Sequence, residues 1–203
     1  MEFILKGFGG EGKFYMTLIL TIGIIGLAIC AERFFYIFIK NSMGRANFMR
    51  NIAQLLQTGR VAEAGHLAAT QNFALAKIIS AVLQNKAKGQ QAIEKAVDEV
   101  FLTEAPRLNR YLNLLPALAN IAMLCGLLGT IFGLILAFDA VANLPAAQRP
   151  QALANGISIV MVNTWSGLAC AIPVLMLHGI LAMQSERLQE ELEEKAVKVM
   201  NLL

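Results

Sequence analysis

The chain has 203 residues, of which 57% are hydrophobic and 15% are charged, and its mean hydropathy is positive. A soluble domain of that length cannot bury so much apolar surface, so the composition excludes an ordinary soluble protein and favours an all-α integral membrane protein. The formal net charge of +3 is small and the basic residues are spread out, so a nucleic-acid partner is not expected.

The first candidate transmembrane helix occupies residues 14–39, after a periplasmic N-terminal segment at residues 1–13. Its uncharged part, Phe14 to Ala31, has the minimal length to cross a hydrocarbon core about 30 Å thick at about 1.5 Å per residue. A cleavable signal peptide is the alternative. Because the apolar run ends on bulky residues rather than on a small-residue cleavage site, we predict a retained span.

Residues 40–110 are expected to form a cytoplasmic helical segment, with helices separated by Gly59 and Gly89. This segment carries ten lysines and arginines, whereas the later loop at residues 139–151 carries only Arg149. Positive residues remain on the cytoplasmic side of a membrane. The predicted orientation therefore has the N-terminus in the periplasm and the C-terminus in the cytoplasm.

Two further transmembrane helices are predicted at residues 111–138 and 152–184, joined by a periplasmic loop at residues 139–151. Neither contains a charged residue between its flanking charges, which are Arg110 and Asp139 for the first and Arg149 and Glu186 for the second. The amphipathic tail, residues 185–203, is expected to continue the third span as a solvated cytoplasmic helix.

No catalytic constellation is present, so we expect neither an enzyme nor a bound cofactor. His66 and His178 lack a cysteine, serine or carboxylate at motif spacing. Each of the three cysteines, Cys30, Cys125 and Cys170, lies within an apolar span. This arrangement fits neither a disulfide framework nor a metal site. We interpret them as small buried hydrophobic residues.

Small residues form a stripe along one face of the second span, at Ala122, Gly126, Thr130, Gly133 and Ala137. A second stripe in the third span comprises Val160, Thr164, Gly167 and Ala171, with Asn163 within reach of the same turn. In a membrane, such stripes either pack helices closely or line a narrow path. Because a polar group facing lipid costs free energy, the two hydroxyls and the amide should face protein or water.

The two later spans contain no carboxylate, although a proton crossing the bilayer normally needs a titratable relay. If this chain conducts protons, another chain must supply the acid. Asp139 stands at a span end, where it is either simply hydrated or a place where ions enter the path.

Several sequence runs resemble the MotA/TolQ/ExbB proton-channel family, and most closely its three-span ExbB and TolQ branch. They are the Glu32-Arg33 pair, the stretch Gly59 to Ala64, the run Gly126 to Gly133 (GLLGTIFG) followed by Ala137-Phe138, and the run Thr164 to Pro173 (TWSGLACAIP). With the topology, the resemblance covers nearly the whole chain.

The resemblance implies a homo-oligomer, usually of five copies, that encloses the single transmembrane helices of two ExbD- or TolR-like partners. It also implies that Thr130 and Thr164 occupy the family's two pore-facing threonine positions, opposite a partner aspartate that takes up protons. Asn163 is placed in the same path. Gly126, Gly129, Gly133 and Gly167 are interpreted as packing positions, and Pro173 as either a packing feature or a hinge.

Two positions depart from the family pattern. Met123 stands where a proline is common, with the nearest proline at Pro116, and Ile159 stands where some relatives carry a glutamate. The expected function is a proton-conducting motor subunit for energised transport through a TonB-like protein, envelope maintenance, gliding or export. The alternative is a structural membrane scaffold that packs through the small stripes and conducts nothing.

Overall fold

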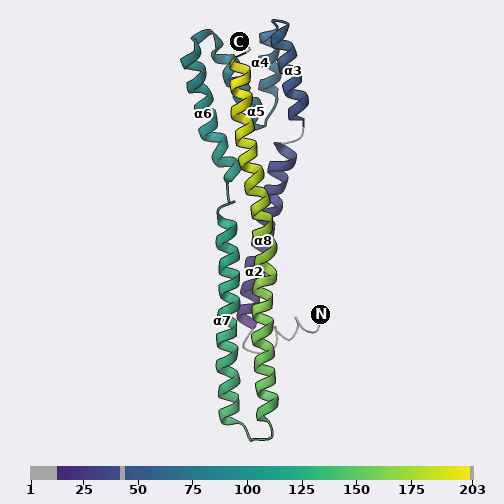
Figure 1. Cartoon of the computed structure of the whole chain (residues 1–203), viewed down its shortest axis with the longest axis vertical. Helices are drawn as coiled ribbons and strands as arrows, with labels where there is room; N and C mark the ends of the chain where they lie inside the picture. Colours follow the sequence, from purple (N-terminus) through teal and green to yellow (C-terminus); the bar gives the residue numbers. More distant parts are fainter. Residues whose placement is uncertain (1–12, 42–43, 202–203) are drawn as a thin grey trace. The chain divides into compact units, whose positions relative to one another are not determined.

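The structure is a computed structural model that describes residues 13–41 and 44–201 (Figure 1). Apart from Lys13, the predicted N-terminal segment at residues 1–13 lies outside the described residues. The helices are α2 (Lys13–Phe34), the π-helical turn η2 (Phe35–Lys40), α3 (Arg45–Gln57), α4 (Val61–Thr70), α5 (Ala74–Asn85), the 3-10 turn η3 (Lys86–Lys88), α6 (Gln90–Asn109), α7 (Leu114–Asn143) and α8 (Arg149–Met200).

No β-strand occurs within these described ranges, and three helical stretches are long and apolar enough to cross a membrane. The predicted all-α fold class with three spans is therefore confirmed. The chain divides into two compact units. Among the described residues, the span unit comprises residues 13–31 and 111–179, and the helical unit comprises residues 32–41, 44–110 and 180–201.

In the span unit, α2 packs through a seam of residues spaced alternately three and four apart, namely Met16, Ile19, Gly23, Gly26 and Cys30, all of them buried. This spacing keeps one side of a helix against its neighbours. A methyl group built on Gly23 would lie 2.8 Å from the Cys170 Sγ, and one on Gly26 would lie 3.1 Å from Val174 Cγ2. Glycine therefore lets α2 approach α8 closely.

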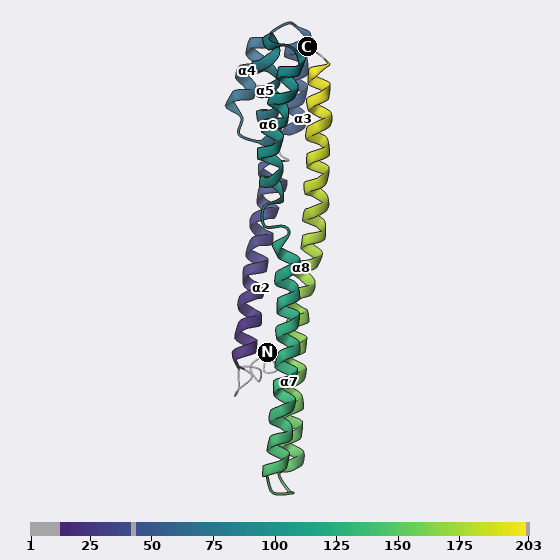
Figure 2. The ribbon, with the colours of Figure 1, turned by 90° about the vertical axis from the view of Figure 1, so that its left-hand side faces the viewer.

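The helices α7 and α8 form an antiparallel pair joined by a short loop, and α2 lies alongside them (Figures 1 and 2). Pro116 is the third residue of α7, within the first turn, where its missing N–H removes no helical hydrogen bond. The helix α7 extends to Asn143, beyond the predicted span end at residue 138. There the Asn143 amide donates to the Asp139 carbonyl oxygen at 3.0 Å and to its carboxylate at 3.1 Å.

The helix α8 runs without a break to Met200 and so includes the segment expected to continue the third span as a helix. It also passes through Pro173, which lies inside the helix and is exposed. Proline has no N–H to donate to the carbonyl four residues earlier, so the backbone at Ala169 loses one helical hydrogen bond.

The helical unit has its own hydrophobic core, which joins α3 to α6 with the last turns of α8. Fully buried side chains at its centre include Ile52, Ile78, Val82 and Leu192. An ion pair of 2.7 Å joins Arg45 of α3 to Glu191 of α8. At the end of α6, the Asn109 side-chain oxygen accepts a hydrogen bond of 2.8 Å from the Ser185 hydroxyl of α8.

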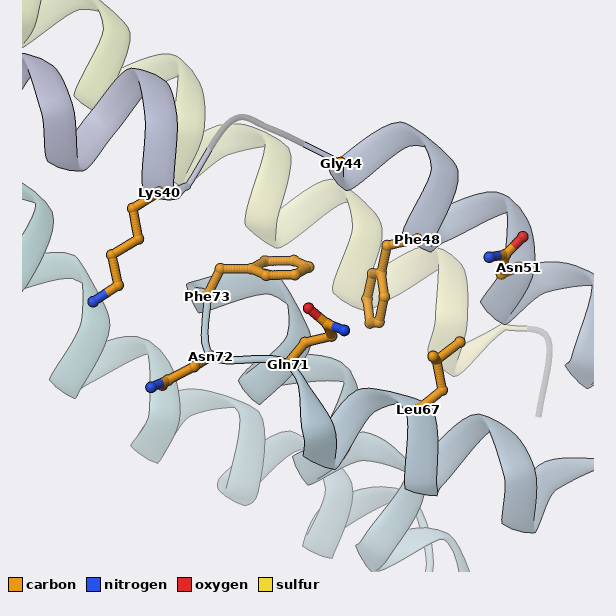
Figure 3. Close-up of a pocket in the computed structure, with 8 residues that line it drawn as sticks. All are labelled: Lys40, Gly44, Phe48, Asn51, Leu67, Gln71, Asn72 and Phe73. Carbon is orange, nitrogen blue, oxygen red and sulfur yellow. The ribbon is translucent and has the colours of Figure 1, made fainter.

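A cavity of about 460 Å³ opens beside α3 and α4 in the helical unit, and Figure 3 shows its lining side chains. Phe48 and Phe73 meet edge to face, with ring centroids 5.1 Å apart and planes at 80°. Lys40 and Asn72 extend on the far side of Phe73 from Phe48 (Figure 3). These two polar side chains also line a second cavity that is described below.

Candidate functional site in the α7–α8 pair

The contact between α7 and α8 brings backbone against backbone. A methyl group on Gly126 would lie 3.0 Å from the Asn163 carbonyl oxygen and 3.4 Å from the Gly167 Cα. In the opposite direction, a methyl group on Gly167 would lie 3.0 Å from the Ala122 carbonyl oxygen. Close approach of this kind is how small residues hold membrane helices together.

The same contact continues toward the loop. A methyl group on Gly133 would lie 2.9 Å from Val160 Cγ2, and Gly156 faces Ala137 without room for any side chain. The part of α7 that meets α8 is thus made of small buried residues, namely Ala122, Gly126, Gly129, Gly133 and Ala137. The sequence pattern placed Thr130 in this stripe, but the buried residue at this level is Gly129. The two positions are only about 100° apart around the helix, so residue spacing alone does not decide between them.

Thr130 and Thr164 lie at the edge of the contact rather than within it. Thr130 is half-buried and Thr164 is exposed. The Thr130 hydroxyl donates to the Leu127 carbonyl at 2.6 Å, and the Thr164 hydroxyl donates to the Val160 carbonyl at 3.2 Å. Each hydroxyl therefore bonds to its own helix, and its oxygen keeps capacity to accept from another group.

Both threonines lie on the side of the α7–α8 pair that faces away from α2. The α2 side is marked by Phe132, whose ring centroid is 5.7 Å from that of Tyr15, and by Cys170, which meets Gly23. At about 100° per residue, Thr130 is about 160° from Phe132 around α7, and Thr164 is about 120° from Cys170 around α8. Because the helices are antiparallel, these rotations bring the two threonines to one side of the pair.

Asn163 lies inside the α7–α8 contact, and its side chain is fully buried. A methyl group on Gly129 would lie 2.7 Å from its Nδ2 atom, so the amide fills the space that the glycine leaves. Neither the Nδ2 nor the Oδ1 atom has a hydrogen-bond partner among the described residues. Native structures pair most buried polar groups, and an unpaired one costs free energy.

The remaining predicted site residues are spread along the pair. Asp139 is exposed near the end of α7, where its carboxylate accepts from Asn143. At the two positions that depart from the family pattern, Met123 is 40% exposed and Ile159 is half-buried. Ile159 still borders the contact, since a methyl group on Gly133 would lie 3.7 Å from its Cγ2 atom.

The glycine contact predicts a large effect of small substitutions. We expect Gly167→Ala to lower the free energy of unfolding by about 1–3 kcal/mol, because the new methyl group meets backbone atoms that no rotamer change can move. Thermal unfolding of the detergent-purified protein measures this effect. Gly179→Ala is the matched control on α8: nothing lies within 4 Å of its new methyl group, so no loss is expected. Equal melting temperatures for the two variants would contradict the contact.

The fold and this site define a helical, multi-pass membrane protein. Its uncharged spans pack through glycines and present hydroxyl groups on one side. Residues 69–194 match the MotA/TolQ/ExbB proton channel family, a range that takes in α7 and most of α8. The chain belongs to this family.

Similar proteins carry ExbB names. The chain is 27% identical over 184 residues to a putative biopolymer transport protein ExbB homolog of Methanothermobacter thermautotrophicus, covering 91% of this chain and 64% of the relative. It is 27% identical over 170 residues to the biopolymer transport protein exbB1 of Vibrio cholerae, covering 81% and 73%. A putative biopolymer transport protein ExbB-like 3 of Synechocystis is 23% identical, covering 80% and 77%.

Proposed function

We propose that this chain is the proton-channel subunit of an ExbB/TolQ-like inner-membrane motor. In this proposal, several copies, five by the family pattern, surround the transmembrane helices of ExbD- or TolR-like partner chains. Proton flow between them is converted into work on a TonB-like or other periplasmic effector, for energised transport, envelope maintenance, gliding or export. The proposal assigns no catalytic reaction to the chain.

The observation that carries the proposal is the position of the two threonines. The α7–α8 pair is packed internally by glycines, and α2 covers its other side. Thr130 and Thr164 lie on the remaining side, which no described helix of the span unit covers. Each threonine oxygen there keeps unused acceptor capacity, so the arrangement favours a polar neighbour from another chain.

The proposal requires an acid from that other chain. Neither α7 before Asp139 nor α8 before Glu186 and after Arg149 contains a carboxylate. Hydroxyls can orient water and donate to an anion, but they do not hold a proton near neutral pH. An aspartate in the partner helix supplies the titratable group. The Thr130 and Thr164 hydroxyls stabilise its charged form by turning from the Leu127 and Val160 carbonyls and donating to the carboxylate instead.

The proposed orientation follows the distribution of positive charge. The helical unit includes the ten lysines and arginines of residues 40–110, whereas the loop between α7 and α8 is followed by Arg149 alone. We therefore place the helical unit in the cytoplasm and the α7–α8 loop in the periplasm. This places the effector on the same side as the loop.

Reconstitution in vesicles tests whether proton flux requires the acid of the partner chain. We expect this chain alone to pass few protons when a potential is applied, because the chain has no carboxylate between Arg110 and Asp139 or between Arg149 and Glu186. Co-reconstitution with an ExbD- or TolR-like single-span partner should raise proton flux. The control is the same complex whose partner carries asparagine in place of its transmembrane aspartate. Rapid proton-specific flux from this chain alone would overturn the proposal.

A non-conducting scaffold is the second candidate. The glycine contact favours it, because packing between α7 and α8 already accounts for the small residues. A scaffold requires the shape of the α7–α8 pair but not the threonine hydroxyls. The two candidates therefore predict opposite results when the hydroxyls alone are removed.

A further inference from the structure

A positively charged cavity of about 250 Å³ lies within the helical unit. Five of its ten lining residues are lysine or arginine and one is glutamate: Arg33, Lys40, Lys77, Arg107, Arg110 and Glu104. Glu104, together with Glu32 that pairs with Arg33, offsets only part of this charge, so the cavity favours an anion. Its volume is slightly below that of pockets for drug-sized ligands, which fits a group the size of a lipid headgroup.

The single carboxylate is already occupied by two of the cations. Glu104 is buried, and its Oε1 atom lies 2.9 Å from the Lys77 Nζ and 2.6 Å from an Arg107 guanidinium nitrogen. Arg33 is buried as well, held at 2.5 Å by Glu32 and donating to the Arg107 carbonyl at 3.0 Å. These bonds fix one wall of the cavity with its positive groups in place.

Lys40 adds charge at the wall formed by η2. Its Nζ lies 5.1 Å from the centroid of the Tyr36 ring, whose other cationic neighbour is Arg33 at 5.0 Å. Figure 3 shows the Lys40 side chain extended beside Asn72, away from Phe48. Two cations at one ring repel each other, and a bound anion relieves that repulsion.

The N-terminus of α5 also lines the cavity, through its first residue Ala74. Asn41 holds it there: the Asn41 Oδ1 accepts from the Ala74 N–H at 3.1 Å, and its Nδ2 donates to the Tyr36 carbonyl at 3.2 Å. The first turn of a helix carries a partial positive charge, which adds to that of the side chains.

Chain connectivity places this cavity at the level where a membrane meets water. Arg33 and Lys40 directly follow the first apolar span, and Arg107 and Arg110 directly precede α7. Beside Arg33, the aromatic side chains of Phe34 and Phe35 are 50% and 62% exposed. These exposed rings at the end of the span offer an apolar surface to acyl chains.

We infer that this cavity binds the phosphate of an anionic phospholipid headgroup. The cations hold the negatively charged headgroup, and the exposed phenylalanines contact the upper part of its acyl chains. This inference does not depend on proton conduction, because none of the residues in it belongs to the α7–α8 contact.

Titration of the full-length, detergent-purified protein with phosphatidylglycerol tests the inference, with the rise in melting temperature as the signal. We expect Lys40→Gln to weaken the apparent affinity about fivefold, since one basic residue near an anionic surface contributes about 1 kcal/mol. Lys40 makes no ion pair with another described residue, so folding should be unaffected, and Lys40→Arg should retain binding. Adding Lys77→Gln should bring the loss to about 25-fold if the two effects add.

Three controls make the result decisive. Lys95→Gln removes the same charge from an exposed position on α6 that does not line the cavity, and it should bind like the wild type. Phosphatidylcholine, which has no net charge, should bind weakly. Equal binding of phosphatidylglycerol by the wild type and Lys40→Gln would overturn the inference. Tighter binding of soluble glycerol phosphate than of phosphatidylglycerol would retain phosphate recognition but overturn the lipid assignment.

Discussion

The double variant Thr130→Val/Thr164→Val is expected to lose most proton-driven work while it assembles normally. Valine keeps the shape of threonine and removes only the hydroxyl. A hydrogen bond to a charged group contributes about 1.5–3 kcal/mol, so each lost hydroxyl should reduce proton-coupled activity about tenfold or more. Activity is measured as energised uptake or proton flux by the complex with its partner.

Assembly should survive because neither hydroxyl holds the span unit together. Both donate to carbonyls of their own helices, and those helices continue without the hydroxyls. Thr21→Val is the matched control, because the Thr21 hydroxyl makes the same kind of bond, to the Thr17 carbonyl at 2.8 Å, on the exposed surface of α2. Undiminished work by the double variant would refute the proposed role of the hydroxyls and favour the scaffold.

The second large effect is expected at Asn163, where stability and activity should move in opposite directions. Asn163→Leu replaces an unpartnered buried amide with an apolar group of similar shape, so the free energy of unfolding should rise by about 1–3 kcal/mol. Under the proposed function, the amide hydrogen-bonds to water or to the proton carrier when the complex works. Its loss should reduce proton flux about tenfold.

Ser166 provides the contrast for this experiment. It is as deeply buried on α8 as Asn163, but its hydroxyl already donates to the Val162 carbonyl at 2.8 Å. Ser166→Ala should therefore give no gain in stability. Thermal unfolding and proton flux are measured on the same preparations. An Asn163→Leu complex that is less stable and equally active would show that the amide serves structure alone.

The spans and the family could be predicted from the sequence because their signals are strong. An uncharged stretch such as Gly126 to Ala137 has few alternatives to crossing a membrane, and its glycine spacing follows one helix face. Which of two neighbouring residues faces the partner helix depends on how the helices cross. Gly129, not Thr130, lies in the contact, and composition alone does not contain that angle.

The burial of Asn163 and the basic cavity were beyond sequence reasoning for a different reason. Polarity predicts that an asparagine in a span avoids lipid, but not that it fills the space left by Gly129. The cavity joins residues from three distant stretches, including Lys40, Lys77 and Arg107. Charged residues at such separations form no periodic pattern, so only the folded chain brings them together.

The backbone contact at Gly126 and Gly167 has a mechanical consequence. Helices that meet through side chains can shift by changing rotamers, whereas these two helices meet through Cα and carbonyl atoms that have no alternative positions nearby. The α7–α8 hairpin should therefore turn or tilt as one stiff body. In the proposed assembly of several copies, movement would then arise by sliding between neighbouring hairpins. Each hairpin would move as one rigid unit around the partner helices.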